Sequence, residues 1–167
     1  MRHAQAVTPW LHGPDDLHRP LTGAGHDAAG RLAAELAALA PTAIVSSPYL
    51  RAVQTVRPAA RLAGLAVETR WVLREWDSGI EARPDYADHY ARSWLDPDLV
   101  RPGGESLRQL TERAVCATRR LAVEHEGVVL VGTHGTFLSR LLLAHGHDMD
   151  WPASRAMPMP AVYRLRP

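Results

Sequence analysis

Cysteine, net charge and long apolar runs are all scarce in this 167-residue sequence, and each scarcity excludes a class of protein. The single cysteine, Cys116, rules out an intrachain disulfide and any metal site built from several cysteines. It lies in a helical pattern with no adjacent histidine, so we expect it to fill the core. A reducing cytoplasm is the compartment that this cysteine usage favours.

Positive and negative charges nearly cancel, so the protein has no strong overall electrostatic field. Nineteen Lys+Arg residues and 18 Asp+Glu residues leave a formal net charge of +1, and arginine supplies the positive set. Any anion preference must therefore be local, and we expect neither nucleic acid nor a membrane as a partner. No apolar run approaches the ~20 residues of a membrane span, and the polar N-terminus lacks a signal-peptide core. These absences predict a soluble, cytoplasmic protein.

Strand-like and helix-like patterns alternate along the chain. The length and a hydrophobic fraction of 46% suit one domain over residues 1–167. Apolar segments typical of strands are 42–46, 66–69, 128–132 and, by alternation, 161–165. Helical spacing or capping signals favour helices over 22–40, 49–63, 85–95, 106–121 and 136–144. Strands separated by helices predict an α/β fold: a three-layer α/β/α sandwich with a mostly parallel, doubly wound sheet.

One segment interrupts this alternation. Residues 71–102 lose clear periodicity and gather proline, aspartate and aromatic residues. We interpret residues of about 76–104 as a small helical lid insertion. Aromatic residues recur in it at every fourth position, at Tyr86, Tyr90 and Trp94. This spacing favours packing over substrate stacking. Trp10 and Trp76 lie near polar motifs in the sequence, and either is a candidate pocket residue.

Three polar segments are expected at one edge of the sheet. In doubly wound sheets ligands sit beyond the carboxyl ends of the strands, which brings together Arg2-His3, 46–51 and 133–136. Arg51 offers a planar charged fork for phosphate oxygens, and two following helices present free backbone amides. A neutral imidazole can form a covalent intermediate, so His3 is the candidate nucleophile, while His134 can donate to the equatorial oxygens.

No metal is needed for this chemistry. The other histidine-rich segment, 145–150, invites a metal interpretation. It follows a predicted helix, where Gly146 is typical of a helix stop and a histidine suits the negative end of the helix dipole. We therefore predict no metal site there and no cofactor.

Six short motifs follow one another over nearly the whole chain. They are Arg2-His3-Ala4-Gln5-Ala6, Leu21-Thr22-x-x-Gly25, 46–55, Leu73-Arg74-Glu75 with Gly79, 102–106 and 131–135. In this order they resemble the histidine phosphatase superfamily, also called the phosphoglycerate mutase-like family. The resemblance implies that His3 takes the phosphoryl group, that Arg2, Arg51 and His134 bind its oxygens, and that Glu75 protonates the leaving oxygen.

A physical argument also supports Glu75. An alkoxide leaves poorly, so an acid within reach is worth about 10²–10⁴ in rate. A bound phosphate dianion favours the protonated form of a nearby carboxyl. The alternative for Glu75 is a loop carboxylate or an ion pair with Arg74 or Arg83. Glu105 competes as the acid, but its position before a helix favours capping and loop fixation.

The phosphate site has two further candidates and one departure from the family pattern. Gly135 opens the last helix beside His134, and Thr8 stands near the place where many relatives carry an asparagine that holds phosphate. Only Met1 precedes the Arg-His pair, which the family carries at the end of a central strand. We expect a misassigned or trimmed start, and a version extended upstream should be more active and more stable.

The lid favours hydrolysis over phosphoryl mutation. It is short and carries six acidic residues against three arginines, so it offers no concentrated basic pocket for a second phosphate. We predict a phosphatase acting on a small phosphorylated metabolite. The alternatives are a phosphohistidine protein phosphatase and a non-catalytic phosphate-binding relative; phosphoglycerate mutase activity is less favoured. Assembly as a homodimer is left open.

Overall fold

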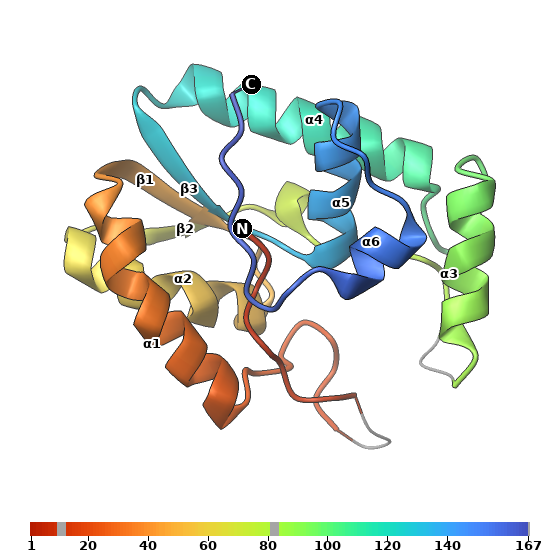
Figure 1. Ribbon diagram of the computed structural model, residues 1–167, viewed down its shortest axis with the longest axis horizontal. Coiled ribbons are helices and arrows are strands. Elements are labelled where there is room, and N and C mark those ends of the chain that lie inside the picture. Colours follow the sequence, from red (N-terminus) through yellow and green to blue (C-terminus); the bar gives the residue numbers. More distant parts are fainter. Residues whose placement is uncertain (10–12, 81–83, 167) are drawn as a thin grey trace.

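A parallel sheet between helical layers organises the computed structural model, which describes residues 1–9, 13–80 and 84–166. The strands are β1 (Pro41–Ser46), β2 (Val67–Thr69) and β3 (Val128–Gly132), in the order β2-β1-β3 (Figure 1). All of their pairings are parallel. The predicted α/β class with a parallel sheet is confirmed.

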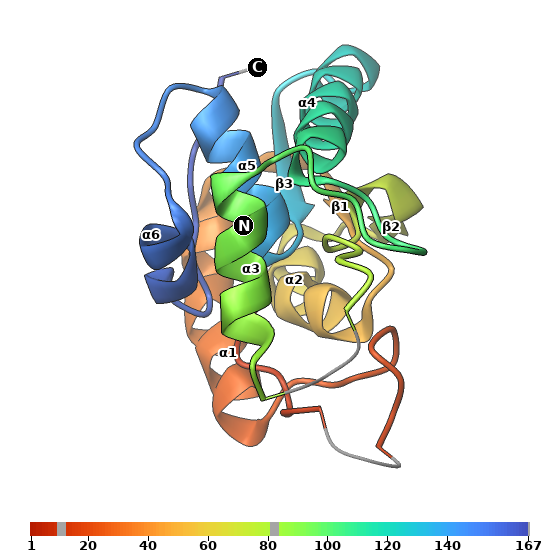
Figure 2. The ribbon, with the colours of Figure 1, turned by 90° about the vertical axis from the view of Figure 1, so that its right-hand side faces the viewer.

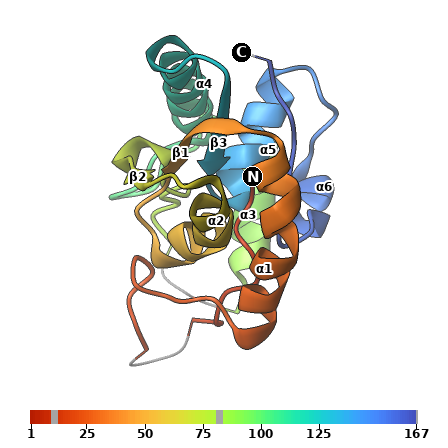
Figure 3. The ribbon, with the colours of Figure 1, turned by 90° about the vertical axis from the view of Figure 1, so that its left-hand side faces the viewer.

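Two pairs of helices cover the sheet. On one face lie α1 (Gly23–Ala38) and α2 (Leu50–Ala63), which pack closely on each other. On the other face lie α4 (Leu107–Glu124) and α5 (Gly135–Ala144) (Figures 1 and 3). None of the described helices is both long and apolar enough to cross a membrane.

Adjacent residues of β1 serve different cores. Successive side chains of a strand point to opposite faces, so Ile44 packs with Val56 on the α2 side. Its neighbour Val45 packs with Leu110 and Phe137 on the other side. Both faces of the strand are buried, which explains why β1 is apolar without alternation.

The segment before His3 continues the sheet beside β3. Arg2 bridges Thr133 in the parallel sense and Ala161 in the antiparallel sense. The amide of His3 donates to the Thr133 carbonyl at 3.0 Å. The prediction of a strand over 161–165 is wrong beyond the bridge at Ala161. Its neighbour there is the short segment 1–3, which already pairs on its other edge with Thr133.

Side-chain caps begin three of the described helices. The Thr22 hydroxyl accepts the Gly25 amide at 3.0 Å and caps α1. Ser106 and Gln109 form a capping box that begins α4. The sequence analysis missed helix α6 (Trp151–Ala156). Asp150 caps its first turn, where a proline is accommodated because the amides of that turn have no partner within the helix. The short 3-10 helix η1 (Trp71–Leu73) was also not predicted.

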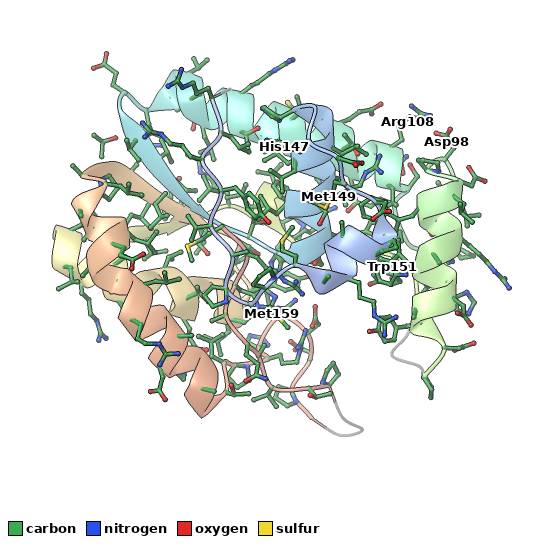
Figure 4. All side chains as sticks on the ribbon, in the orientation of Figure 1. Asp98, Arg108, His147, Met149, Trp151 and Met159 are labelled. Carbon is green, nitrogen blue, oxygen red and sulfur yellow. The ribbon has the colours of Figure 1, made fainter. Side chains whose placement is uncertain are left out.

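The predicted lid holds α3 (Tyr86–Leu95), which stands at one end of the molecule beside α6 (Figure 2). Tyr90 lies with its ring 5.4 Å from that of Trp151, and Figure 4 shows Trp151 on α6 next to α3. Tyr90 and Trp94 pack against the core formed by α4 and α5. This agrees with the expected packing role for Tyr90 and Trp94, whereas Tyr86 is exposed.

Cys116 is exposed on α4, so the prediction that it fills the core is wrong. The buried positions of α4 are Leu107, Leu110, Ala114, Ala117 and Leu121. Cys116 lies beside this stripe in sequence but about 100° away from Ala117 around the helix, because an α-helix has 3.6 residues per turn. Its side chain therefore faces away from the sheet.

Candidate active site

The carboxyl ends of β1 and β3 and the segment beside β3 meet at one edge of the sheet. Ser47 follows β1, His134 follows β3, and His3 follows the bridge at Arg2. The rings of His3 and His134 lie edge to face, with their centroids 5.3 Å apart. Residues 131 positions apart in sequence thus share one site.

Hydrogen bonds fix the orientation and the tautomer of His3. Its Nδ1 lies 2.7 Å from the Ala4 carbonyl oxygen, which can only accept, so the ring proton is assigned to Nδ1. Nε2 accepts a hydrogen bond from Nε of Arg51 at 3.2 Å. Burial, and then the charge of Arg51, lowers the pKa of His3 to about 3. The neutral ring therefore carries its lone pair on Nε2, toward Arg51.

His134 is completely buried at the first turn of α5. Its Nε2 lies 2.8 Å from the Ser47 hydroxyl oxygen, and its Nδ1 has no hydrogen-bond partner among the described residues. Burial, followed by the charge of Arg51, holds the pKa of His134 well below its usual value. Ser47 was not singled out by the sequence analysis, although it lies inside a motif that was.

Arg51 is buried and uses each of its nitrogens. Besides the bond to His3, its Nη1 donates to the Asp16 carbonyl at 2.6 Å and its Nη2 to the Asp16 carboxylate at 3.0 Å. Arg19 binds the other oxygen of the same carboxylate. Burial opposes the charge of Asp16, but Arg51 and Arg19 together hold its pKa below the usual value.

Asp16 and Arg19 are site residues that the sequence analysis missed. They belong to a polar loop, 13–20, that carries two adjacent aspartates before the Leu21-Thr22 motif. The adjacent charges were the available signal. Pairing across 35 positions with Arg51 depends on how that loop folds back over α2, which no local pattern reports.

Arg2 packs against the first residue of α5. A Cβ atom at Gly135 would lie 3.2 Å from both Cζ and Nε of Arg2. The Nη1 of Arg2 donates to the Met157 carbonyl, whereas its buried Nε has no partner among the described residues. The absence of a side chain at Gly135 therefore lets a guanidinium lie directly on the N-terminus of α5.

The carboxylate of Glu75 also binds this N-terminus. It accepts hydrogen bonds from the amides of Thr136 at 3.2 Å and Phe137 at 3.0 Å, and from its own neighbour Trp76 at 2.9 Å. First-turn amides have no partner within the helix, and the helix dipole favours an anion there. Arg74, offered above as an ion-pair partner, instead lies 3.9 Å from Glu105.

The remaining candidates lie outside this cluster. Thr8 is exposed, and none of the described hydrogen bonds joins it to His3, Arg51 or His134. Trp10 and Arg83 fall outside the described residues. Trp76 is buried in the core, where its indole N–H donates to the Glu105 carbonyl at 2.8 Å, so it is not a pocket wall.

Comparisons with known proteins agree with this arrangement. YhfR from Bacillus stearothermophilus is 27% identical with a TM-score of 0.69, covering 89% of this chain and 79% of that one. A mycobacterial glucosyl-3-phosphoglycerate phosphatase, solved in complex with VO3, is 26% identical with a TM-score of 0.69 and coverages of 94% and 84%. Phosphoglycerate mutase from Bacillus anthracis shares the fold at 19% identity, with a TM-score of 0.68 and coverages of 86% and 76%.

Two comparisons used the sequence alone. A search of the curated proteins gave no match. The family model of the histidine phosphatase superfamily (branch 1) matches residues 1–165, nearly the whole chain. With the two histidines and the guanidinium of Arg51 gathered at the edge of a parallel sheet, the chain belongs to the histidine phosphatase superfamily.

Proposed function

We propose that this protein hydrolyses small-molecule phosphomonoesters through a phosphohistidine intermediate on His3. The main support is the tautomer and orientation of the His3 ring. Its proton is held on Nδ1 by the Ala4 carbonyl, and its lone pair on Nε2 faces Arg51 at 3.2 Å. A neutral, oriented imidazole beside a guanidinium is suited to attack a bound phosphoryl group.

In the first step, Arg51 exchanges its hydrogen bond to Nε2 of His3 for one to a phosphoryl oxygen, Nε2 attacks phosphorus, and the P–O bond to the leaving group breaks. The bound phosphate dianion favours the protonated form of the Glu75 carboxyl, which gives its proton to the leaving oxygen, so an alcohol departs. Arg51, Arg2 and His134 bind the three non-bridging oxygens, whose charge they stabilise. The positive charge that the imidazole gains is supported by the hydrogen bond from Nδ1 to Ala4.

In the second step, water attacks phosphorus and the P–N bond breaks. Glu75, now ionised, takes the proton of the attacking water, and inorganic phosphate leaves. His3 returns to its neutral form and Glu75 to its protonated form, so the cycle closes without any other reactant. The protein supplies every proton transfer, and we expect activity to persist in a metal chelator.

Two further observations support hydrolysis. Among the similar structures at 25% identity or more is a phosphatase named for glucosyl-3-phosphoglycerate, whereas the mutase quoted above is 19% identical. One arginine of the lid is also bound within it: Arg101 donates to the Ser93 hydroxyl and to the His89 carbonyl. These contacts leave Arg101 engaged within the lid rather than directed at a second phosphate.

The test combines turnover with trapping of the intermediate. The purified protein is assayed in chelator with 4-nitrophenyl phosphate and with a panel of phosphorylated metabolites. Rapid quench with labelled substrate should reveal an acid-labile adduct in the wild type that is missing in His3→Ala. Phosphate binding without turnover would instead indicate a non-catalytic relative. Turnover confined to phosphohistidine peptides would favour a protein phosphatase.

A further inference from the structure

One arginine outside the phosphate cluster binds three backbone carbonyls of the loop that carries Glu75. Arg113 lies on the second turn of α4, and its side chain is only 12% exposed. Its Nη1 donates to the carbonyls of Val72 at 2.8 Å and Arg74 at 3.0 Å. Its Nη2 donates to the carbonyl of Glu75 at 3.3 Å.

The other two donors of Arg113 go to one carboxylate. Nε donates to Oε2 of Glu105 at 3.1 Å, and Nη2 donates to Oε1 of the same side chain. A guanidinium has five N–H donors in a rigid plane, and here five acceptors meet them. The Arg113 head group is therefore fixed in place, and it holds three carbonyls of the 72–75 backbone.

Glu105 ties the far side of the same loop. Its amide donates to the Asp77 carbonyl at 2.8 Å, its Oε1 accepts the Asp77 amide at 3.3 Å, and its carbonyl accepts the indole N–H of Trp76. Residue 75 thus lies between two anchors. Its main chain is bound by Arg113, and its carboxylate is bound by the first-turn amides of α5.

We infer that Arg113, acting with Glu105, is a positioning residue that holds Glu75 in register with the leaving oxygen of the substrate. The inference rests on the proposed function, because it requires Glu75 to be the proton donor. Neither side chain touches the phosphate cluster in the described contacts. Their effect on the reaction passes through the backbone of the loop, where a small displacement of the acid is costly in rate.

The experiment measures how the rate depends on the leaving group. Values of kcat/KM, which report the steps up to phosphohistidine formation, are determined with 4-nitrophenyl phosphate, phenyl phosphate and an alkyl phosphate. In Arg113→Lys, which keeps the charge but has three donors, we expect less than about a threefold loss with the nitrophenyl ester and about a 10- to 100-fold loss with the alkyl ester. A 4-nitrophenolate leaves without a proton, so it is insensitive to the acid.

Two further variants complete the experiment. Arg119→Lys, an exposed arginine on the same helix, should leave every substrate unchanged. Glu105→Gln, which keeps an acceptor for the Asp77 amide, should show the selective loss in milder form. It also serves as the test if Arg113→Lys does not fold. An equal loss with all esters in folded variants, or unfolding of both variants, would overturn the inference.

Glu75→Gln separates this inference from the proposed function. If Glu75→Gln shows the steep leaving-group dependence while Arg113→Lys does not, the positioning role fails and the acid role stands. If Glu75→Gln leaves the dependence unchanged, Glu75 is not the acid, and the positioning role falls together with that part of the mechanism. Melting temperatures of all variants report whether a loss is merely structural.

Discussion

Burial controls the protonation of the two site histidines at the scale of single residues. His3 is 8% exposed and His134 is fully buried, and desolvation is the largest cause of the lowered pKa of each. The charge of Arg51 acts in the same direction. A nucleophilic imidazole must be neutral, so the burial that makes the site costly to fold also keeps its nucleophile ready.

This burial predicts acid sensitivity. The unfolded chain takes up a proton at His3 below its ordinary pKa of 6.5, whereas the folded chain does so only near 3. The free energy of unfolding should therefore decrease as the pH is lowered from about 6.5 to about 3. In His3→Asn the fall should be shallower by about 1.4 kcal/mol per pH unit, measured by urea unfolding without phosphate.

A histidine that is already exposed provides the control for this measurement. His147 is exposed in the segment after α5, where Figure 4 labels it, and His147→Asn is the matched surface substitution. Identical slopes in the wild type and His3→Asn would mean that His3 is not held neutral by the fold.

The N-terminus of α5 gathers the candidate site at the scale of elements. Its first turn donates to the Glu75 carboxylate, carries His134 at its cap, and lies against Arg2 through Gly135. The Glu75 carboxyl, the His134 ring and the Arg2 guanidinium are thus all positioned by the N-terminus of α5. A shift of this end would misplace three groups together.

Gly135→Ala tests how closely Arg2 must lie on that end. The added Cβ would come 3.2 Å from the guanidinium, so Arg2 has to move by a few tenths of an ångström or more. Alanine favours the helical backbone, so stability should hold or rise by about 0.5–1 kcal/mol. We expect kcat/KM to fall about tenfold, because the displaced charge binds the phosphoryl oxygens poorly.

The matched change is Gly30→Ala in α1, where a Cβ meets nothing within 4 Å. It should raise stability by a similar amount and leave activity as it is. If Gly135→Ala retained full activity, the close approach of Arg2 would not be needed for catalysis.

At the scale of the whole molecule, the site joins three segments that lie far apart in the sequence. Residues 46–51 and 133–136 reach it from the ends of β1 and β3, and residues 1–3 reach it from the segment that bridges Thr133 beside β3, between two separate cores. An anion bound there would be held by the folded arrangement alone. Binding should therefore stabilise the entire fold rather than one loop.

Phosphate should accordingly raise the melting temperature of the wild type. At a concentration of about 100 times Kd, the free energy of unfolding should increase by about 2.7 kcal/mol. Arg51→Gln should lose most of this gain, since Arg51 supplies the buried guanidinium beside His3. Chloride at equal ionic strength is the control, and an equal shift with chloride would contradict specific binding.

The sequence itself determined the main elements and the segments that carry the chemistry. Val128–Gly132 and Pro41–Ser46 were predictable as buried strands because both of their faces are apolar. Thr22 and Ser106 were predictable as helix starts because a cap acts on amides only a few residues away. These signals are local, so a single chain displays them.

The tertiary structure alone decided which distant groups meet. The pairing of Arg51 with Asp16 and the five bonds of Arg113 join segments that no local pattern connects. The exposure of Cys116 likewise depends on how α4 is rotated against the sheet. A shift of one position along the helix separates the exposed Cys116 from the buried Ala117. Local patterns fix which elements form, whereas the packing of their faces against one another fixes the geometry between them, and catalysis depends on that geometry.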